Sequence, residues 1–100
     1  MIIYSVTIKI DKPLADEWIT WMRSEHIPDV MATGCFLEHR VLRLMLDEDD
    51  GSTFSIQYKA NSMDEISKYQ DKFAAELQQK HIARFKDKFV AFRTLLEELE

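Results

Sequence analysis

Histidine is the side chain best suited to acid–base chemistry near neutral pH, and two histidines stand close to expected helix ends. His26 precedes Ile27, Pro28 and Asp29, and His81 follows a long helical pattern. In alternating strand–helix order the two helices point in opposite directions, so we expect His26 and His81 at opposite ends of the molecule. The sequence has no His-x-x-x-His or Cys-x-x-Cys pattern, and we therefore expect neither a metal site nor a cofactor.

A pocket with aromatic walls, a base and a cation is expected near His26. His26 is the candidate general base, and Arg40 is the candidate cation that stabilises negative charge. The candidate ligand-binding residues are Trp21, Asp29, Tyr58 and Arg93. A structural interpretation competes, because a histidine after a helix can bond the last carbonyls while Asp29 caps the following turn. The sequence leaves both interpretations of His26 open.

Arg40 shares its expected strand face with the apolar residues Phe36 and Leu42, which predicts a buried guanidinium. A buried cation must be paired, and Glu38 or Asp29 can supply the carboxylate. The arginine is then either one partner of a structural ion pair at the end of the core or an anchor for a small carboxylate or phosphate ligand.

The elements that must position these residues begin with a strand, Ile2–Ile10, in which apolar and polar residues alternate. Asp11 and Pro13 mark the start of the helix that follows. Pro28 disfavours helical geometry at the residue before it, so we expect this helix to weaken at Ile27.

Two strands, at 35–46 and 53–60, are joined by the acidic turn 47–52 into a predicted hairpin. Ser62 and Glu65 form a capping-box pattern at the start of a second helix, which should end near Lys80 or His81. Its predicted apolar side consists of Met63, Ile66, Phe73 and Leu77. A connector at 81–87, which includes Arg84 and Phe85, leads to a last strand at 88–96.

The element order β-α-β-β-α-β predicts an α+β, ferredoxin-like fold, formed as one domain over residues 1–100. Right-handed connections give an antiparallel sheet in the order 4-1-3-2, with both helices on one face. The other face combines small polar residues with large apolar ones from the last strand, namely Val90, Phe92 and Leu96. Such a mixed face favours a homodimer in which two sheets pack together.

Net charge, at −5, disfavours binding to nucleic acid, which needs clustered positive charge. The third strand also lacks the stacking aromatics of an RNA-recognition motif on its open side. No apolar run is long enough for a bilayer, and the first residues lack the features of a secretory signal. We therefore expect a cytoplasmic protein with no membrane partner, in which the lone Cys35 is a small buried residue.

Four segments resemble a bacterial family known only as a domain of unknown function: Trp18-x-x-Trp21, the stretch 25–36, His81-x-x-Arg84-Phe85 and the stretch 89–95. The most specific part is His-Ile-Pro-Asp-Val-Met-Ala-Thr-Gly. More distantly, the sequence is similar to the dimeric α+β barrel superfamily, which includes cofactor-independent monooxygenases, haem-binding and haem-degrading enzymes, dehalogenases and stress proteins. The resemblance implies the fold and a face-to-face dimer, and it transfers no reaction.

Three functions remain open at this point. The first is a dimeric binding or accessory module for a small ligand. The second is a cofactor-independent enzyme, monooxygenase-like or isomerase-like, that acts on a hydrophobic small molecule. The third is a structural or protein-interaction dimer. Arg84 and Phe85 suit either the dimer seam or a loop over the cavity.

Overall fold

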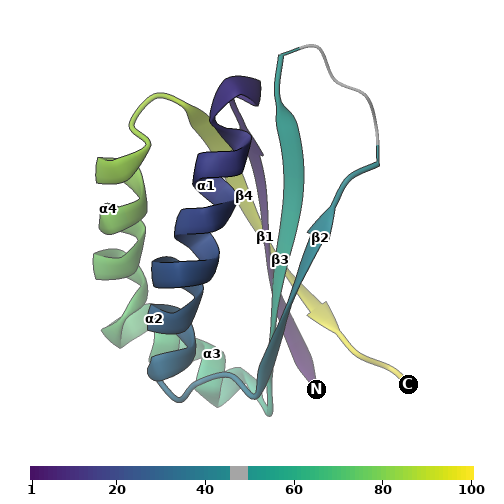
Figure 1. Ribbon diagram of the computed structural model, residues 1–100. Helices are drawn as coiled ribbons and strands as arrows, with labels where there is room; N and C mark the ends of the chain where they lie inside the picture. Colours follow the sequence, from purple (N-terminus) through teal and green to yellow (C-terminus); the bar gives the residue numbers. More distant parts are fainter. Residues whose placement is uncertain (46–49) are drawn as a thin grey trace.

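A four-stranded antiparallel sheet with helices on one face forms the molecule (Figure 1). The computed structural model describes residues 1–45 and 50–100. The strands are β1 (Ile2–Ile10), β2 (Glu38–Arg43), β3 (Ser52–Ala60) and β4 (Phe89–Glu97). Their order across the sheet is β2-β3-β1-β4, which is the predicted 4-1-3-2 read from the other edge. The predicted ferredoxin-like fold is thus confirmed.

The first helical segment runs without a break from residue 12 to residue 32 and contains a π-helical turn. Its parts are the 3-10 turn η1 (Lys12–Leu14), α1 (Ala15–Trp21), the π-helix η2 (Met22–His26) and α2 (Ile27–Ala32). Ile27 keeps helical dihedrals, with φ −62° and ψ −45°, and its N–H donates to the carbonyl of Met22. The prediction that the helix weakens before Pro28 is therefore wrong, because the wider π turn accommodates the proline.

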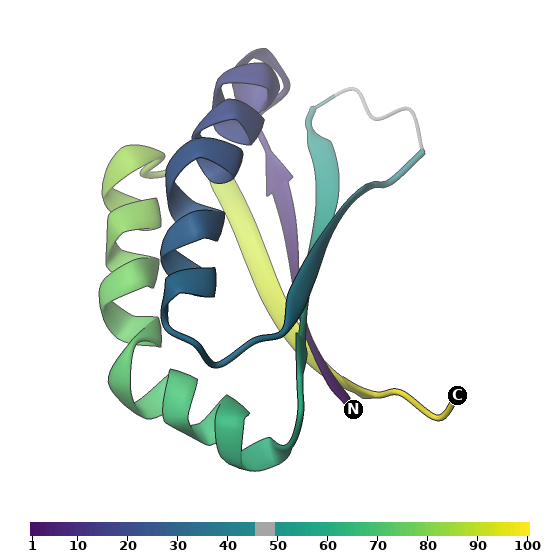
Figure 2. The same ribbon diagram turned by 60° about the horizontal axis from the view of Figure 1, so that its bottom comes forward.

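The second helical segment consists of α3 (Met63–Lys72) and α4 (Ala74–Arg84), which meet at a bend visible in Figure 2. Phe73 marks the bend, because its φ of −126° departs from helical geometry. Helix α4 continues to Arg84, so the predicted end near Lys80 or His81 and the connector at 81–87 are wrong. Helix α3 starts after Ser62 as predicted, yet the Ser62 side chain makes no capping hydrogen bond.

The hairpin strand β2 is shorter than predicted. Cys35 and Phe36, which we expected in the strand, precede it and are buried in the core. The first half of the predicted turn at 47–52 lies outside the described residues, because these leave out 46–49. The predicted strands at 53–60 and 88–96 are confirmed within one residue at each end.

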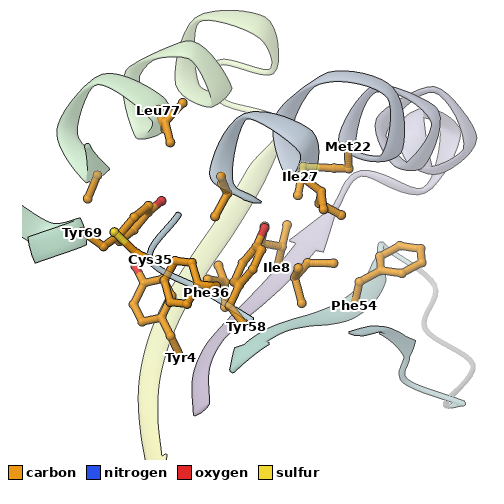
Figure 3. Close-up of a cluster of buried hydrophobic side chains, with 14 of the residues drawn as sticks. Tyr4, Ile8, Met22, Ile27, Cys35, Phe36, Phe54, Tyr58, Tyr69 and Leu77 are labelled. Atoms are coloured by element: carbon orange, nitrogen blue, oxygen red, sulfur yellow. The ribbon is translucent and has the colours of Figure 1, made fainter. Parts of the chain in front are cut away.

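The core lies between the sheet and the helices, where alternate residues of β1 and β3 meet the helical segments (Figure 3). The buried strand residues are Tyr4, Val6, Ile8, Ile10, Phe54, Ile56, Tyr58 and Ala60. Trp18, Met22 and Ile66 cover them from the helices. Met63 is 48% exposed, contrary to its predicted place on the apolar side. Over the described part of the chain, no helix combines the length and the apolar character that a bilayer crossing requires.

Candidate active site between the helices and the sheet

His26 and His81 lie side by side, with their ring centroids 5.6 Å apart. The prediction that they occupy opposite ends of the molecule is wrong. Neither residue marks the end of its helix, since the first segment continues beyond His26 to Ala32 and α4 continues beyond His81 to Arg84. The two antiparallel segments therefore pass each other with both histidines inside the contact.

The His81 ring is held by aromatic neighbours and by one hydrogen bond. The Trp18 indole Nε1–H donates to His81 Nε2 over 2.9 Å, and both side chains are buried. The Trp21 ring stacks on His81 with an interplanar angle of 23° and a centroid distance of 5.6 Å. Phe89 contacts the imidazole at a centroid distance of 4.1 Å. These contacts fix both the position and the plane of the imidazole.

Trp21 also stacks on His26, at 5.2 Å between centroids and 29° between planes. His26 is the last residue of the π-helix η2. A π turn shifts the side chains after it relative to an ordinary helix, and such turns occur frequently at functional sites. The structure thus brings together two of the predicted site residues, Trp21 and His26, and adds His81 to them.

A small cavity of about 20 Å³ lies beneath these rings, between the helices and the sheet. Its volume is enough for about one water molecule. The lining residues are Tyr4, Val6, Ile8, Met22, His26, Val30, Ile56, Tyr58, Tyr69, Gln78, His81 and Arg93. Its polar groups are phenol, imidazole, amide and guanidinium, and no carboxylate is among them.

An open groove of about 650 Å³ lies on the outer side of the first helical segment and α4. The lining residues are Trp21, Ser24, Glu25, His26, Pro28, Asp29, Lys80, Ala83 and Arg84. His26 is the one described residue that lines both the groove and the inner cavity. Its ring is therefore the shared wall between the exposed space and the buried one.

Burial sets the protonation of the site. The pKa of His26 is lowered to about 4, chiefly by desolvation; the charge of Asp29 opposes this shift, and the nearby cations Arg93 and Lys80 contribute to it. Desolvation likewise lowers the pKa of His81 to about 4. Burial raises the pKa of Tyr58 well above its ordinary value. At neutral pH the site therefore contains two neutral imidazoles and a protonated phenol.

Arg93 supplies the positive charge of the cavity. It stands opposite Val6 in the β1–β4 register, which places it on the helix-covered side of the sheet. Burial raises the pKa of Tyr4, and hydrogen bonding with Arg93 and Gln78 partly offsets this rise. Within the described ranges, Arg93 forms no ion pair with a carboxylate, so its charge is available to a ligand.

Arg40 does not join this site. It is exposed on the open face of the sheet, and its Nη2 donates to Gln57 Oε1 over 2.7 Å. The predicted burial is wrong because Phe36 precedes β2 and does not share the alternation of the strand. Glu38 is also paired differently, with Lys59 at 3.5 Å. The other predicted ligand residues are divided, with Asp29 at the groove, and Tyr58 and Arg93 at the cavity.

Several residues of the site were missed from the sequence, although His81 was considered for acid–base chemistry and then placed at the opposite end of the molecule from His26. The missed residues are Trp18, His81, Tyr4, Tyr69 and Gln78. Tyr4 and Tyr58 face each other in the β1–β3 register, a pairing that strand alternation could have revealed. The contact of His81 with Trp18 has no such signal, because it depends on how far each helix extends.

Arg84 and Phe85 belong to this helix layer. Arg84 pairs with Glu17 at 2.9 Å and lies over the Phe85 ring at 5.0 Å, while Phe85 is buried. Arg84 lines the groove. Across residues 1–45 and 50–100, no group of three His, Cys, Asp or Glu side chains is arranged to hold a metal ion.

Comparison with known proteins identifies a family and a fold. Residues 1–99 match the family described as "Domain of unknown function (DUF4286)". No curated protein matches the sequence. Several solved structures resemble the chain throughout its length, all at low sequence identity, and that likeness shows the fold alone.

Three of these structures illustrate the range. A dimeric ferredoxin-like protein from an uncultured marine organism has a TM-score of 0.71 at 11% identity, covering 100% of this chain and 96% of its own. HapK from Hahella chejuensis has a TM-score of 0.72 at 14% identity, covering 99% and 93%. SnoaB, a cofactor-independent oxygenase from Streptomyces nogalater, has a TM-score of 0.65 at 11% identity, covering 99% and 94%.

Proposed function

The chain belongs to the DUF4286 family of domains of unknown function, and we propose that it is a homodimeric protein that binds a small organic molecule against His26. The observation that carries this proposal is the position of His26 as the wall shared by the groove and the inner cavity. A ligand in the groove contacts a neutral imidazole there, and behind that imidazole lie Arg93 and the tyrosines.

The groove has the size and chemistry of a small-molecule site. Its volume of about 650 Å³ falls within the range of roughly 300–1,000 Å³ that is typical of such sites. The rings of Trp21 and His26, which stack on each other, both line the groove and provide an aromatic wall that suits a planar ligand. Lys80 and Asp29 at the rim provide opposite charges that can orient it.

The open face of the sheet supports the homodimer. Its central strands present small polar groups, among them Ser5 and Ser55, whose hydroxyls lie 3.3 Å apart. Large apolar side chains stand exposed along its edges, namely Leu42, Leu44, Val90, Phe92 and Leu96. A surface of this kind is typical of a protein interface. A second copy of the chain is the occupant that we propose, and the dimeric ferredoxin-like neighbour supports that choice.

A second candidate function is cofactor-independent catalysis at the same site. The supporting observation is that a neutral His26 and the cationic Arg93 line one cavity. His26 would remove a proton from an acidic ligand, and Arg93 would stabilise the anion that forms. The likeness to SnoaB, described as a cofactor-independent oxygenase, is consistent with this function.

Native mass spectrometry of protein freshly purified from its own host tests ligand binding. We expect one small molecule per subunit in the wild-type protein. Ala83→Trp fills the groove and should abolish this retention, whereas Ala75→Trp, on the same helix but outside the groove, should keep it. The proposal fails if Ala83→Trp retains the molecule, or if the wild-type protein retains none and planar acids and ketones leave the His26 resonances unchanged.

A further inference from the structure

We propose that Trp18 is a positioning residue that fixes His81 as a hydrogen-bond donor toward the inner cavity. The cavity then selects a ligand group with an acceptor oxygen, such as a carbonyl or a carboxylate. The ligand class rests on the proposed function, whereas the state of His81 can be tested without any ligand.

The hydrogen bond between Trp18 and His81 determines the position of the imidazole proton. An indole nitrogen can only donate, so the bond of 2.9 Å requires a lone pair on His81 Nε2. A neutral imidazole carries one proton, and that proton must then be on Nδ1. Trp18 therefore determines which ring nitrogen of His81 is the donor.

The surroundings of His81 indicate where its Nδ1–H donor is directed. Among residues 1–45 and 50–100, Trp18 is the one side chain shown to form a hydrogen bond with His81. In the described part of the chain, no buried side-chain nitrogen or oxygen lacks a partner, so Nδ1 must be accessible. The space that His81 lines is the inner cavity, and the Nδ1–H group is available there.

The imidazole of His81 cannot easily flip to exchange the positions of its two nitrogens. Trp21 stacks on one side of the ring and Phe89 contacts it at 4.1 Å between centroids. Turning the ring would also leave the buried Trp18 N–H without an acceptor, which is unfavourable in an apolar environment. Packing and hydrogen bonding thus favour the same tautomer.

The lining and the size of the cavity limit which ligand group fits it. Arg93 can only donate, and burial keeps the Tyr58 and Tyr69 hydroxyls protonated by raising the pKa of each. With His81, four of the lining groups can each donate a hydrogen bond into a space of about 20 Å³, which Gln78 and His26 also line. That space holds about one water-sized group. A single acceptor oxygen fits it, and the remainder of a ligand would lie in the groove beyond His26.

Nitrogen-15 NMR of the wild-type protein at neutral pH tests the tautomer directly. We expect His81 to show only the Nδ1–H form. We also expect a scalar coupling between Trp18 Nε1 and His81 Nε2, because such a coupling is transmitted through the hydrogen bond. Protonation of His81 on Nε2, or a mixture of both tautomers, would overturn the inference.

Two tryptophan variants separate positioning from packing. Trp18→Phe removes the donor, and we expect the single His81 tautomer to give way to a mixture. Trp21→Phe is the matched control, since Trp21 stacks on His81 without bonding to it, and the Nδ1–H form should persist. An unchanged tautomer in Trp18→Phe contradicts the role of Trp18. Should that variant not fold, the wild-type coupling decides the question alone.

Three small aromatic probes test the ligand class. Acetophenone and benzoate carry acceptor oxygens, and we expect both to shift the His81 Nδ1–H signal. Benzylamine is protonated at neutral pH and then carries only donors, so it should bind about tenfold more weakly, which corresponds to the loss of about one hydrogen bond. Equal binding of all three overturns the acceptor preference. If none binds, the proposed function fails, while the tautomer measurement still decides the role of Trp18.

Discussion

The helix-covered face and the open face of the sheet are formed by alternate residues of the same strands, yet polar side chains are arranged differently on the two faces. On the covered face, the polar groups of His26, His81 and Arg93 gather around one small cavity in an otherwise apolar core. On the open face, polar groups bond to one another across strands, as Arg40 does with Gln57, and the apolar side chains lie at the edges.

This difference separates two roles within one sheet. The covered face contains the core and holds two histidines whose partial burial lowers their pKa. The open face keeps polar groups satisfied in the centre and presents apolar area at its edges, which suits association with a second copy.

Adjacent residues of β1 give the most direct comparison of stability. Ile8 is 3% exposed and faces the helices, whereas Thr7 faces the open side. Ile8→Ala should lower the free energy of unfolding by about 2–5 kcal/mol, because it leaves a cavity in the core. Thr7→Ala should change it by about 0.5 kcal/mol or less. Urea denaturation measures both, and similar losses would refute the assignment of the two faces.

Acid should destabilise the covered face through its histidines. The pKa of His81 is about 4 in the folded protein, whereas the ordinary value of 6.5 applies to the unfolded chain. As the pH falls, His81 is therefore protonated in the unfolded chain first. The contribution of His81 to the free energy of unfolding is fully present above pH 6.5. Between pH 6.5 and about 4 this free energy falls by about 3 kcal/mol. His81→Gln should reduce this pH dependence in urea denaturation. An identical dependence in the variant would contradict the assigned protonation.

Association should depend on the open face. Phe92 is 62% exposed there in the single chain. Phe92→Asp should raise the dimer dissociation constant by about 30-fold or more, the effect of losing an interface residue that contributes about 2 kcal/mol. Analytical ultracentrifugation measures this change. Ile82→Asp, an exposed apolar position on the helix layer, is the control and should leave the dimer intact. A wild-type protein that is monomeric at micromolar concentration would contradict the dimer.

Arg40 should have the smallest effect, because it is exposed on the face opposite His26. Arg40→Met should change the free energy of unfolding by less than about 1 kcal/mol and leave ligand binding at His26 unchanged. Thermal denaturation and probe titration measure the two properties. A loss of binding in this variant would show that Arg40 belongs to the site after all.

The fold was accessible from the sequence because its signals are local. Alternation in β1 and β3 identified the buried strand faces, and Ser62 marked the start of α3. The errors arose where tertiary contacts override local preference. The π turn keeps the helix intact before Pro28, and packing extends α4 to Arg84.

The candidate site was harder to predict from the sequence than the fold, because its geometry depends on how far the two helical segments extend. Trp21, His26, Tyr58 and Arg93 were named in advance, and the structure places them around the groove and the cavity. The contact between His26 and His81 could not be predicted, since two residues at expected helix ends proved to be inside the helices. Arg40 was misplaced because the chain changes its alternation before β2 begins.

The most direct test of the account is to map ligand contacts on the two faces of the sheet by NMR, using acetophenone as the probe. We expect the side-chain signals of His26 and Trp21 to shift first, with no change at Thr7 or Gln57 on the open face. Shifts centred on Thr7 and Gln57, with His26 unchanged, would contradict the proposal that the ligand site lies on the helix-covered side.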